Sequence, residues 1–204
     1  RNNLSVHHEA LYMTKKYLSF HKETPTQESI LIGRKLQTGV YNVGGKELTL
    51  IFSIPVRSIK PLLVSLGFEN IDNNLQKNIS VYSFYDKKDY FLDFITYHGT
   101  DEEFLELVEK KNTQVLIDTD ALAYNEDTFV ISFNEQQCNS FFGDKPNFLQ
   151  NENYEQLVNY NFLCQISAND LPDELQDLFY LNDAVGYIFL KNNLDSGIFF
   201  VQTT

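Results

Sequence analysis

Carboxylate side chains gather in the segment 118–127, which carries Asp118 and Asp120 and then Glu126 and Asp127. Closely spaced carboxylate oxygens are the groups that calcium prefers in proteins. A calcium loop of the EF-hand type starting at Asp118 would need glycine at its sixth position and glutamate at its twelfth, where this chain has alanine and phenylalanine. The segment is therefore predicted to be a solvated acidic loop, or a set of contacts for lysine and arginine side chains of a protein partner.

The histidines and glycines form no recognisable catalytic or cofactor-binding motif. His7 and His8 are adjacent, so on a helix they point about 100° apart and cannot share one metal ion as an i, i+4 pair does. His21 and His98 have no recognisable nucleophile or patterned carboxylate beside them, and Gly44-Gly45 lacks the spacing of phosphate-binding loops. We predict no catalytic residue, no metal site and no cofactor, with two carboxylates that converge in a hydrolytic pocket as the alternative.

Charge is distributed unevenly along the chain. Residues 1–102 carry 12 lysines and arginines against 11 aspartates and glutamates, whereas residues 103–204 carry 4 against 17, within a net charge of −12. A field of this sign repels nucleic acid and anionic lipid and attracts basic proteins. The composition therefore favours a basic protein partner and disfavours nucleic acid and membranes.

Part of the acidic charge has a local explanation in predicted helices. Thr100 and Glu103 match a capping box at the start of a helix that runs to Lys111, where the helix dipole stabilises acidic side chains. Glu106 and Glu109 lie further along and have no such reason. A second acidic group lies at the start of another predicted helix, where some of its carboxylates can cap the helix and no lysine or arginine balances the rest. Its members are Asp170, Asp173, Glu174 and Asp177.

The acidic residues without a local role are predicted to contact the partner. Exposed carboxylates speed the encounter with a basic surface, and a few aromatic anchors supply most of the affinity. Tyr124 is the candidate anchor because it lies inside the acidic segment. The predicted partner-binding residues are Glu106, Glu109, Asp118, Asp120, Tyr124, Glu126 and Asp127.

Strands joined by hairpins, with a few helices, are expected to position these residues. An amphipathic helix is predicted from Val6 to about His21, with Ser5 as its N-cap. Two hairpins are predicted, 40–43 with 47–56 and 79–85 with 90–97. Further strands are predicted at 114–117, 128–133, 162–166, 185–190 and 198–202, and short helices at 58–66, 101–111, 154–160 and 173–179.

These elements predict an α+β fold. Its sheet is mainly antiparallel with hairpins and a few short helices, and it carries the N-terminal amphipathic helix. The gaps between elements are short and no linker interrupts them, so a single domain of residues 1–204 is predicted. Cys138 and Cys164 lie in apolar surroundings that suit free thiols. No apolar run approaches the roughly 18 residues of a membrane span, and no signal peptide is recognised. A cytoplasmic protein is therefore predicted.

Three pieces of the last third of the chain share an order with a known family. They are GDKPNFLQ at 143–150, then FLCQI and DLP within 162–172, and NDAVGYIFL at 182–190. They resemble the YwqG-like family of bacterial domains of unknown function, except that Asp144 and Phe148 stand where members often have a second glycine and a tryptophan. The resemblance implies scaffold or pocket roles for Gly143, Pro146, Phe148, Gln150, Gln165, Asp183 and Gly186.

Charge and resemblance together give the functional expectation. The resemblance implies no established enzyme activity, but such domains occur near bacterial toxin genes and are suspected of immunity or binding roles. We therefore predict an immunity-type protein that neutralises a basic bacterial toxin, such as a nuclease, by direct binding. The alternatives are a small-molecule-binding or hydrolytic domain with a pocket near residues 142–150 and Asp183, and an accessory protein without a dedicated partner.

Overall fold

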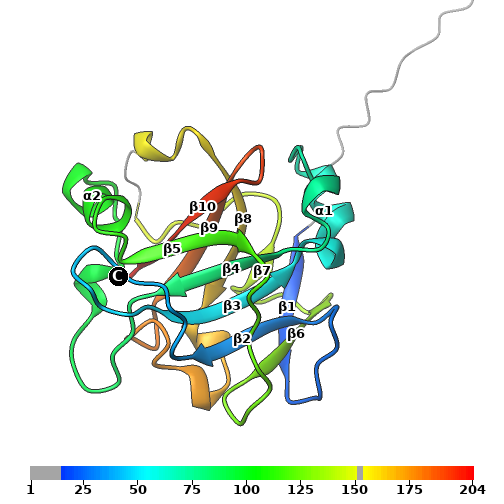
Figure 1. Ribbon diagram of the computed structural model, residues 1–204, viewed down its shortest axis with the longest axis horizontal. Coiled ribbons are helices and arrows are strands. Elements are labelled where there is room, and N and C mark those ends of the chain that lie inside the picture. The colour runs from blue at the N-terminus through cyan, green and yellow to red at the C-terminus, as the bar shows by residue number, and fades with distance from the viewer. Residues whose placement is uncertain (1–14, 151–153) are drawn as a thin grey trace, which may run out of the picture.

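In its described residues, 15–150 and 154–204, the computed structural model of the chain is a closed antiparallel β-barrel of ten strands (Figure 1). Around the barrel the order is β1-β6-β2-β3-β4-β5-β10-β9-β8-β7, and β7 pairs with β1. The strands are β1 (Lys16–His21), β2 (Ile30–Lys35), β3 (Thr49–Pro55), β4 (Asn78–Ser83), β5 (Thr113–Asp118), β6 (Phe129–Asn134), β7 (Phe141–Phe142), β8 (Tyr160–Ser167), β9 (Val185–Lys191) and β10 (Ser196–Gln202).

Helices are short in this part of the chain. The two α-helices are α1 (Lys60–Ser65) and α2 (Asp101–Val108) among the described residues, and the others are single turns of 3-10 helix. These turns are η1 (Val56–Ile59), η2 (Asp72–Asn74), η3 (Leu92–Phe94), η4 (Glu155–Leu157), η5 (Ala168–Asp170) and η6 (Asp173–Leu175). None of the helices in the described residues is long and apolar enough to cross a membrane.

The strands bury apolar side chains on both faces, which explains the high content of phenylalanine and tyrosine. Along β10, Phe199 and Val201 belong to the cluster that fills the barrel, whereas Ile198 and Phe200 belong to a second cluster on the outside of β8–β10. This alternation follows from the two-residue period of a strand. The barrel interior is therefore packed with side chains, and covering segments must shield the outer clusters from water.

Segments between the strands provide that cover. The second cluster includes Tyr97 and Leu107 from the chain between β4 and β5, and Leu157 from η4 before β8. A third cluster on the outside of β2, β3, β4 and β6 includes Leu122 from the loop that joins β5 to β6. The backbone N–H of Leu122 donates to the hydroxyl of Ser53 at 2.8 Å, which fixes this loop across β3.

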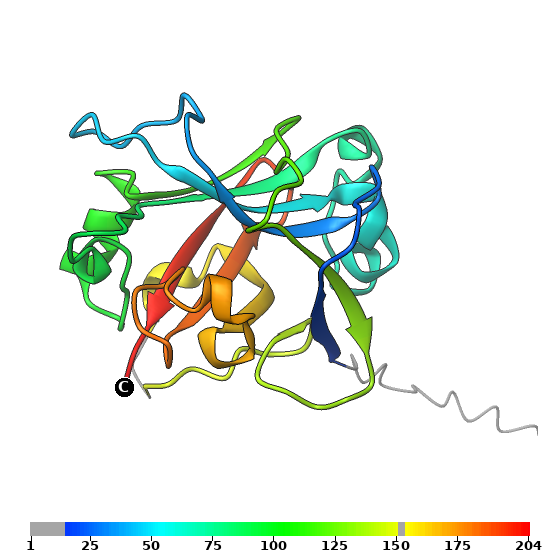
Figure 2. The same ribbon diagram turned by 90° about the horizontal axis from the view of Figure 1, so that it is seen from below.

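The turns between β8 and β9 close one end of the barrel. Leu171, Leu175, Leu178 and Phe179 are buried in the interior cluster although they lie outside the strands. Figures 1 and 2 draw these turns in orange, and their polar residues Asp173, Glu174 and Asp177 are exposed. Their exposed carboxylates, Asp173, Glu174 and Asp177, are thereby held on a rigid apolar base.

The predicted α+β class is wrong, because the protein is mainly β. Residues 16–21 of the predicted N-terminal helix form β1, which pairs with both β6 and β7, and the earlier part of that helix lies outside the described residues. The sequence of β1 alternates as a strand does, with Leu18 buried and Phe20 packed against the interior cluster. Pairing with strands far along the chain thus outweighs the local helical pattern.

The second predicted hairpin is also wrong. Its first half is β4, but the segment 90–97 contains the turn η3 rather than a strand. That segment instead bonds to β10: the N–H of Val201 donates to Ile95 O at 2.8 Å, and the N–H of Tyr97 donates to Val201 O at 3.1 Å. The predicted capping box of α2 is confirmed, with both reciprocal hydrogen bonds between Thr100 and Glu103 present.

Candidate functional site

A polar cleft of about 550 Å³ opens beside the turns that precede β9. Four parts of the chain build it: the end of β2, the segment after β4, the loop between β5 and β6, and the turns around η6. The residues that line this acidic cleft are Arg34, Leu36, Tyr85, Lys87, Asp127, Asp173, Glu174 and Asp177.

Arg34 lies at the centre of the acidic cleft and joins its walls. Its Nη2 pairs with Asp177, its Nη1 donates to the backbone carbonyl of Glu174 at 3.0 Å, and Nη1 lies 3.8 Å from Oδ2 of Asp127. The guanidinium carbon is 5.0 Å from the ring centroid of Tyr85, and the side chain is only 13% exposed. The cleft therefore already holds one guanidinium between carboxylates and an aromatic face.

Tyr85 completes this network. Its hydroxyl donates to Oδ2 of Asp177 at 2.8 Å. Burial, reinforced by this hydrogen bond, raises the pKa of Tyr85 to about 12, while the positive charge of Arg34 opposes the shift. The hydroxyl therefore stays protonated at physiological pH and keeps Asp177 oriented.

The acidic cleft carries more negative than positive charge. Its lining holds four carboxylates against the two cations Arg34 and Lys87. Asp173 and Glu174 are exposed, and neither forms an ion pair with any described residue. Such an arrangement attracts a cationic group and offers it open acceptors.

Aromatic side chains border the acidic cleft. A second hollow of about 370 Å³, lined by Gln176, Asp177, Tyr180, Leu181 and Asn182, shares Asp177 with the cleft. Tyr90 and Tyr180 are 50% and 37% exposed and meet at right angles with ring centroids 4.9 Å apart. Exposed tyrosines next to unpaired carboxylates have the composition of a protein-binding surface.

The predicted partner-binding residues do not form one surface. Figure 1 separates α2, which packs against β5, from the orange turns of the acidic cleft. On α2, Glu106 forms an ion pair with Lys110 at 2.6 Å, so one of the two predicted contact carboxylates of this helix is neutralised. The other, Glu109, is exposed.

Asp118 and Asp120 have a structural role instead. The hydroxyl of Tyr82 lies 2.9 Å from Oδ2 of Asp118 and 2.6 Å from Oδ2 of Asp120, and Ser80 donates to Asp118 at 2.5 Å. Burial and these carboxylates raise the pKa of Tyr82. The two aspartates thus tie the start of the β5–β6 loop to the outside of β4.

The other end of that loop reaches the acidic cleft. Asp127 lines it and faces Arg34, whereas Glu126 receives the ammonium of Lys22 on its backbone carbonyl. Tyr124 is 51% exposed, as expected of an anchor, but it is not among the residues that line the cleft. Asp127 is therefore the predicted partner-binding residue that the structure brings to this site.

The family-like residues brace the segment 143–150 against the sheet. The side-chain amide of Gln165 accepts from the N–H of Asn147 at 2.7 Å and donates to Asn139 O at 2.9 Å. Gln150 donates to Thr203 O at 3.1 Å, and Phe148 lies 4.1 Å from the ring centroid of Tyr154. These contacts fit the scaffold role that the resemblance implied.

The remaining family-like residues follow the same pattern. Gly143 has φ +85°, which suits the tight turn after β7, and Pro146 is partly buried in the segment that follows. A side chain at Gly186 would meet Phe199 at 2.8 Å. Asp183 is exposed at the turn before β9.

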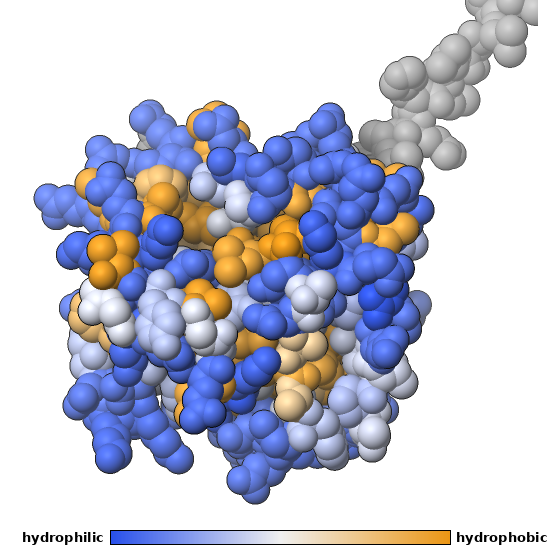
Figure 3. Space-filling view, viewed as in Figure 1, coloured by the Kyte–Doolittle hydropathy of each residue, from blue (hydrophilic) through white to orange (hydrophobic). Residues whose placement is uncertain are grey.

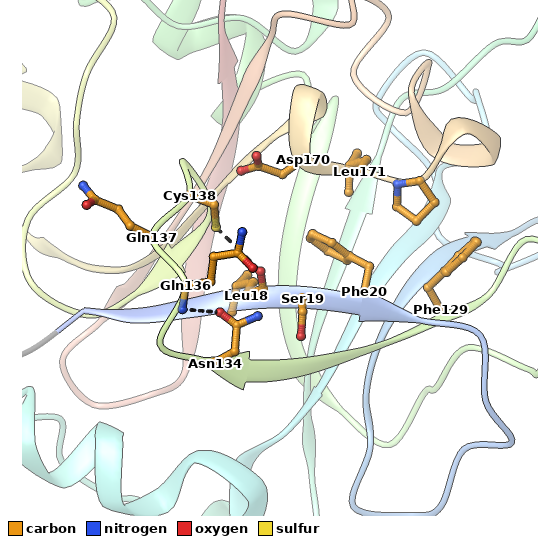
Figure 4. Close-up of a pocket in the computed structure, with 11 residues that line it drawn as sticks. Leu18, Ser19, Phe20, Phe129, Asn134, Gln136, Gln137, Cys138, Asp170 and Leu171 are labelled. Carbon is orange, nitrogen blue, oxygen red and sulfur yellow. Dashed lines mark hydrogen bonds between the residues drawn. The ribbon is translucent and has the colours of Figure 1, made fainter.

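A third cavity, of about 430 Å³, lies beside β1 and contains a thiol (Figure 4). Cys138 donates to Ser140 O at 3.1 Å, and Asp170 accepts from the hydroxyl of Ser140 at 2.6 Å. Ser19 and His21 approach within 2.8 Å, but Figure 4 shows the side chain of Ser19 pointing away from Cys138 and Asp170. No described carboxylate hydrogen-bonds to His21, so this solvent-exposed pair lacks the orienting group of a hydrolytic triad.

An apolar groove of about 220 Å³ runs between α2 and the short β5–β10 contact. Figure 3 shows apolar side chains gathered in this upper left part of the surface. Val108, Leu116 and Ile198 line the groove, together with Lys111 as its single charged residue among the described lining. This composition provides no chemistry that selects a ligand.

Among the described residues, no group of three or more histidines, cysteines, aspartates or glutamates could hold a metal ion. No model of a known protein family matches the chain, and no curated protein is similar to it in sequence. The resemblance to YwqG-like domains therefore stays a prediction.

Sequence reasoning missed Arg34, Tyr85 and Tyr180 as site residues. Asp173, Glu174 and Asp177 were recognisable as an unneutralised acidic group, but nothing in the sequence links them to β2. The pair Arg34 and Asp177 is separated by 143 positions, so only the barrel brings it together.

Proposed function

We propose that the protein is an immunity-type binding protein that neutralises a basic toxin by direct contact, with the acidic cleft at the centre of the interface. The observation that carries this proposal is the cleft itself, in which Asp173 and Glu174 remain unpaired beside exposed tyrosines. Open carboxylates favour a cationic partner, and exposed aromatic rings supply anchoring area.

The overall charge supports the same partner class. The chain has a net charge of −12, and residues 103–204 supply all of the excess negative charge, so a basic protein is attracted from a distance before specific contacts form. A nuclease is a fitting target because its nucleic-acid-binding surface is itself basic. The resemblance to YwqG-like domains supports the immunity role.

We place this interaction in the cytoplasm. Cys138 and Cys164 are both free, which agrees with a reducing compartment. The proposal requires no catalytic residue and no cofactor, since neutralisation follows from covering the basic surface of the toxin.

The experiment is affinity capture from the native host followed by kinetics with the purified partner. We expect a basic protein that binds one to one, with an association rate constant that falls steeply as salt is added. Neutralising two open carboxylates in Asp173→Asn/Glu174→Gln should weaken binding by about tenfold.

The matched control is Glu106→Gln/Glu109→Gln, which removes the same two charges from α2. Because α2 lies away from the acidic cleft, this control should change affinity by no more than about twofold. A captured partner that is acidic, or one that responds equally to both double variants, would overturn the proposed interface. Rescue of growth when the partner is expressed in cells tests neutralisation itself.

A further inference from the structure

We infer that the hollow beside Tyr180 binds an arginine, rather than a lysine, of the basic partner; this inference rests on the proposed function. The hollow and the acidic cleft lie on two sides of Asp177, which lines both. One side is occupied by the protein's own Arg34. The other offers similar groups and has no guanidinium of its own among its described lining residues.

The occupied side shows what holds a guanidinium here. Arg34 receives a carboxylate from Asp177, a backbone carbonyl from Glu174 and the ring of Tyr85. A flat guanidinium can donate to two acceptors while its face rests on an aromatic ring, whereas an ammonium acts as a point charge and is more strongly hydrated. Carboxylate, neutral oxygen and tyrosine ring together therefore favour arginine.

The open side repeats this set of groups. Tyr180 supplies a ring that is 37% exposed, and Asp177 supplies the carboxylate, whose side chain is 51% exposed. Each carboxylate oxygen can accept more than one hydrogen bond, so the contacts of Asp177 with Arg34 and Tyr85 leave acceptor capacity. The amides of Gln176 and Asn182 line the same hollow and provide neutral oxygens.

The ring of Tyr180 is held in place by its neighbours in spite of an unusual backbone conformation. Tyr180 has φ +71°, a left-handed conformation that is costly for a bulky side chain and favourable for glycine. Such outliers persist where surrounding contacts hold them. Here Tyr90 and Phe91 both contact the ring at right angles, with centroids 4.9 and 5.4 Å away, and hold it at the rim.

Charge around the hollow points to a cation as its occupant. Asp173 and Glu174 lie on the same turns as Asp177 and are unpaired among the described residues. Of the two cations that line the neighbouring acidic cleft, Lys87 is exposed, after β4, and opposes the approach of a cationic group. Replacing Lys87 by glutamate should therefore strengthen binding of any cationic peptide.

The test compares two probes of equal charge: a short glycine peptide that carries arginine side chains and the same peptide with lysines. Binding is measured by calorimetry, and backbone amide shifts in the NMR spectrum locate each peptide. We expect both peptides to shift the amides of residues 173–182, with the arginine peptide binding about fivefold to tenfold more tightly. Lys87→Glu should tighten both.

Two variants isolate the ring. Tyr180→Gly removes the ring, and glycine accepts the left-handed backbone; thermal unfolding of this variant separates a loss of binding from a loss of folding. It should abolish the preference for arginine while leaving the lysine peptide bound, and Tyr180→Phe should keep the preference. Equal affinities for the two peptides, or an unchanged preference in Tyr180→Gly, would overturn the arginine inference and leave the proposed function standing. If neither peptide shifts residues 173–182, both proposals fail.

Discussion

Arg34 on β2 and Asp177 in the turns before β9 form an ion pair that joins two parts of the chain separated by 143 positions. The pair fixes the turns that carry the open carboxylates to the wall of the barrel. Nε of Arg34 is buried and has no hydrogen-bond partner among the described residues, so Arg34 leaves one of its own donors unsatisfied. The contacts of its two Nη atoms with the surrounding carboxylates determine its position instead.

Removing Arg34 should therefore destabilise the protein more than the loss of an ordinary ion pair with exposed carboxylates would. Asp127 and Asp177 are 43% and 51% exposed, and solvent screens the lost attraction. We expect Arg34→Met to lower the free energy of unfolding by about 1–2 kcal/mol. Urea denaturation measures this change. The control Arg57→Met removes an arginine whose partner, Glu28, is 64% exposed, and should cost only about 0.5 kcal/mol. Equal losses in the two variants would contradict a special role for Arg34.

The capping box of α2 predicts a dependence of stability on pH. Burial alone would raise the pKa of Glu103, but hydrogen bonds from the backbone and ring of His98 and from Thr100 outweigh it and hold the pKa below its ordinary value. A carboxyl with a lowered pKa stabilises the folded state above its ordinary pKa, about 4.3, and loses that contribution as pH falls through the folded value.

Glu103→Gln should consequently destabilise the protein by about 1 kcal/mol at neutral pH, and the difference from the wild type should shrink below about pH 4. Unfolding in urea over a series of pH values checks this. Glu102→Gln changes the same charge in the same helical turn without the capping bonds and should show a smaller effect. A difference that stays constant from neutral to acidic pH would rule out titration of Glu103 as its source.

Local pattern predicted many of the strands but not the barrel. Apolar segments identified most of β4 to β10, and the short helix predicted at 58–66 contains α1. The prediction of an N-terminal helix was wrong at β1, because this strand forms by pairing with residues far along the chain. Tyr17, for example, lies opposite Asn134 of β6. Closure depends on such pairs, and their register is not encoded in any short segment.

The candidate site was predictable only in part, for the same reason. Asp127 was recognisable as a candidate because other acidic residues lie near it in the sequence. Asp173 and Asp177 were recognisable because no nearby lysine neutralises them. Arg34 and Tyr85 lie in segments with no unusual composition. Conversely, Asp118 and Asp120 looked like contacts for a partner, but inside the fold their carboxylates are hydrogen-bonded to Tyr82 and bind the β5–β6 loop to β4.

Gly186 tests how tightly β9 packs. A Cβ built at this position would lie 2.8 Å from Phe199 and 2.9 Å from Phe179, both buried in the interior cluster. Gly186→Ala should destabilise the protein by about 1–3 kcal/mol, since both rings are fully buried and would have to shift within a packed core. At Gly44 the nearest atom, on Asn42, is 3.5 Å away, so Gly44→Ala is the matched control with little effect. Thermal unfolding that ranks the two variants equally would contradict this packing.

Tyr82 provides the test that separates the structural aspartates from the binding surface. Its hydroxyl is shared by Asp118 and Asp120, so Tyr82→Phe leaves two carboxylates facing an apolar ring. We expect a loss of about 1–3 kcal/mol of stability, measured by urea denaturation, because partly buried acceptors lose their donor. Tyr124→Phe, in the same loop but 51% exposed, should change stability by less than about 0.5 kcal/mol. Binding of the arginine peptide should be unchanged in Tyr82→Phe while the protein remains folded. If that variant keeps its stability and loses the peptide, Asp118 and Asp120 belong to the partner surface after all, and the acidic cleft is not the whole of the site.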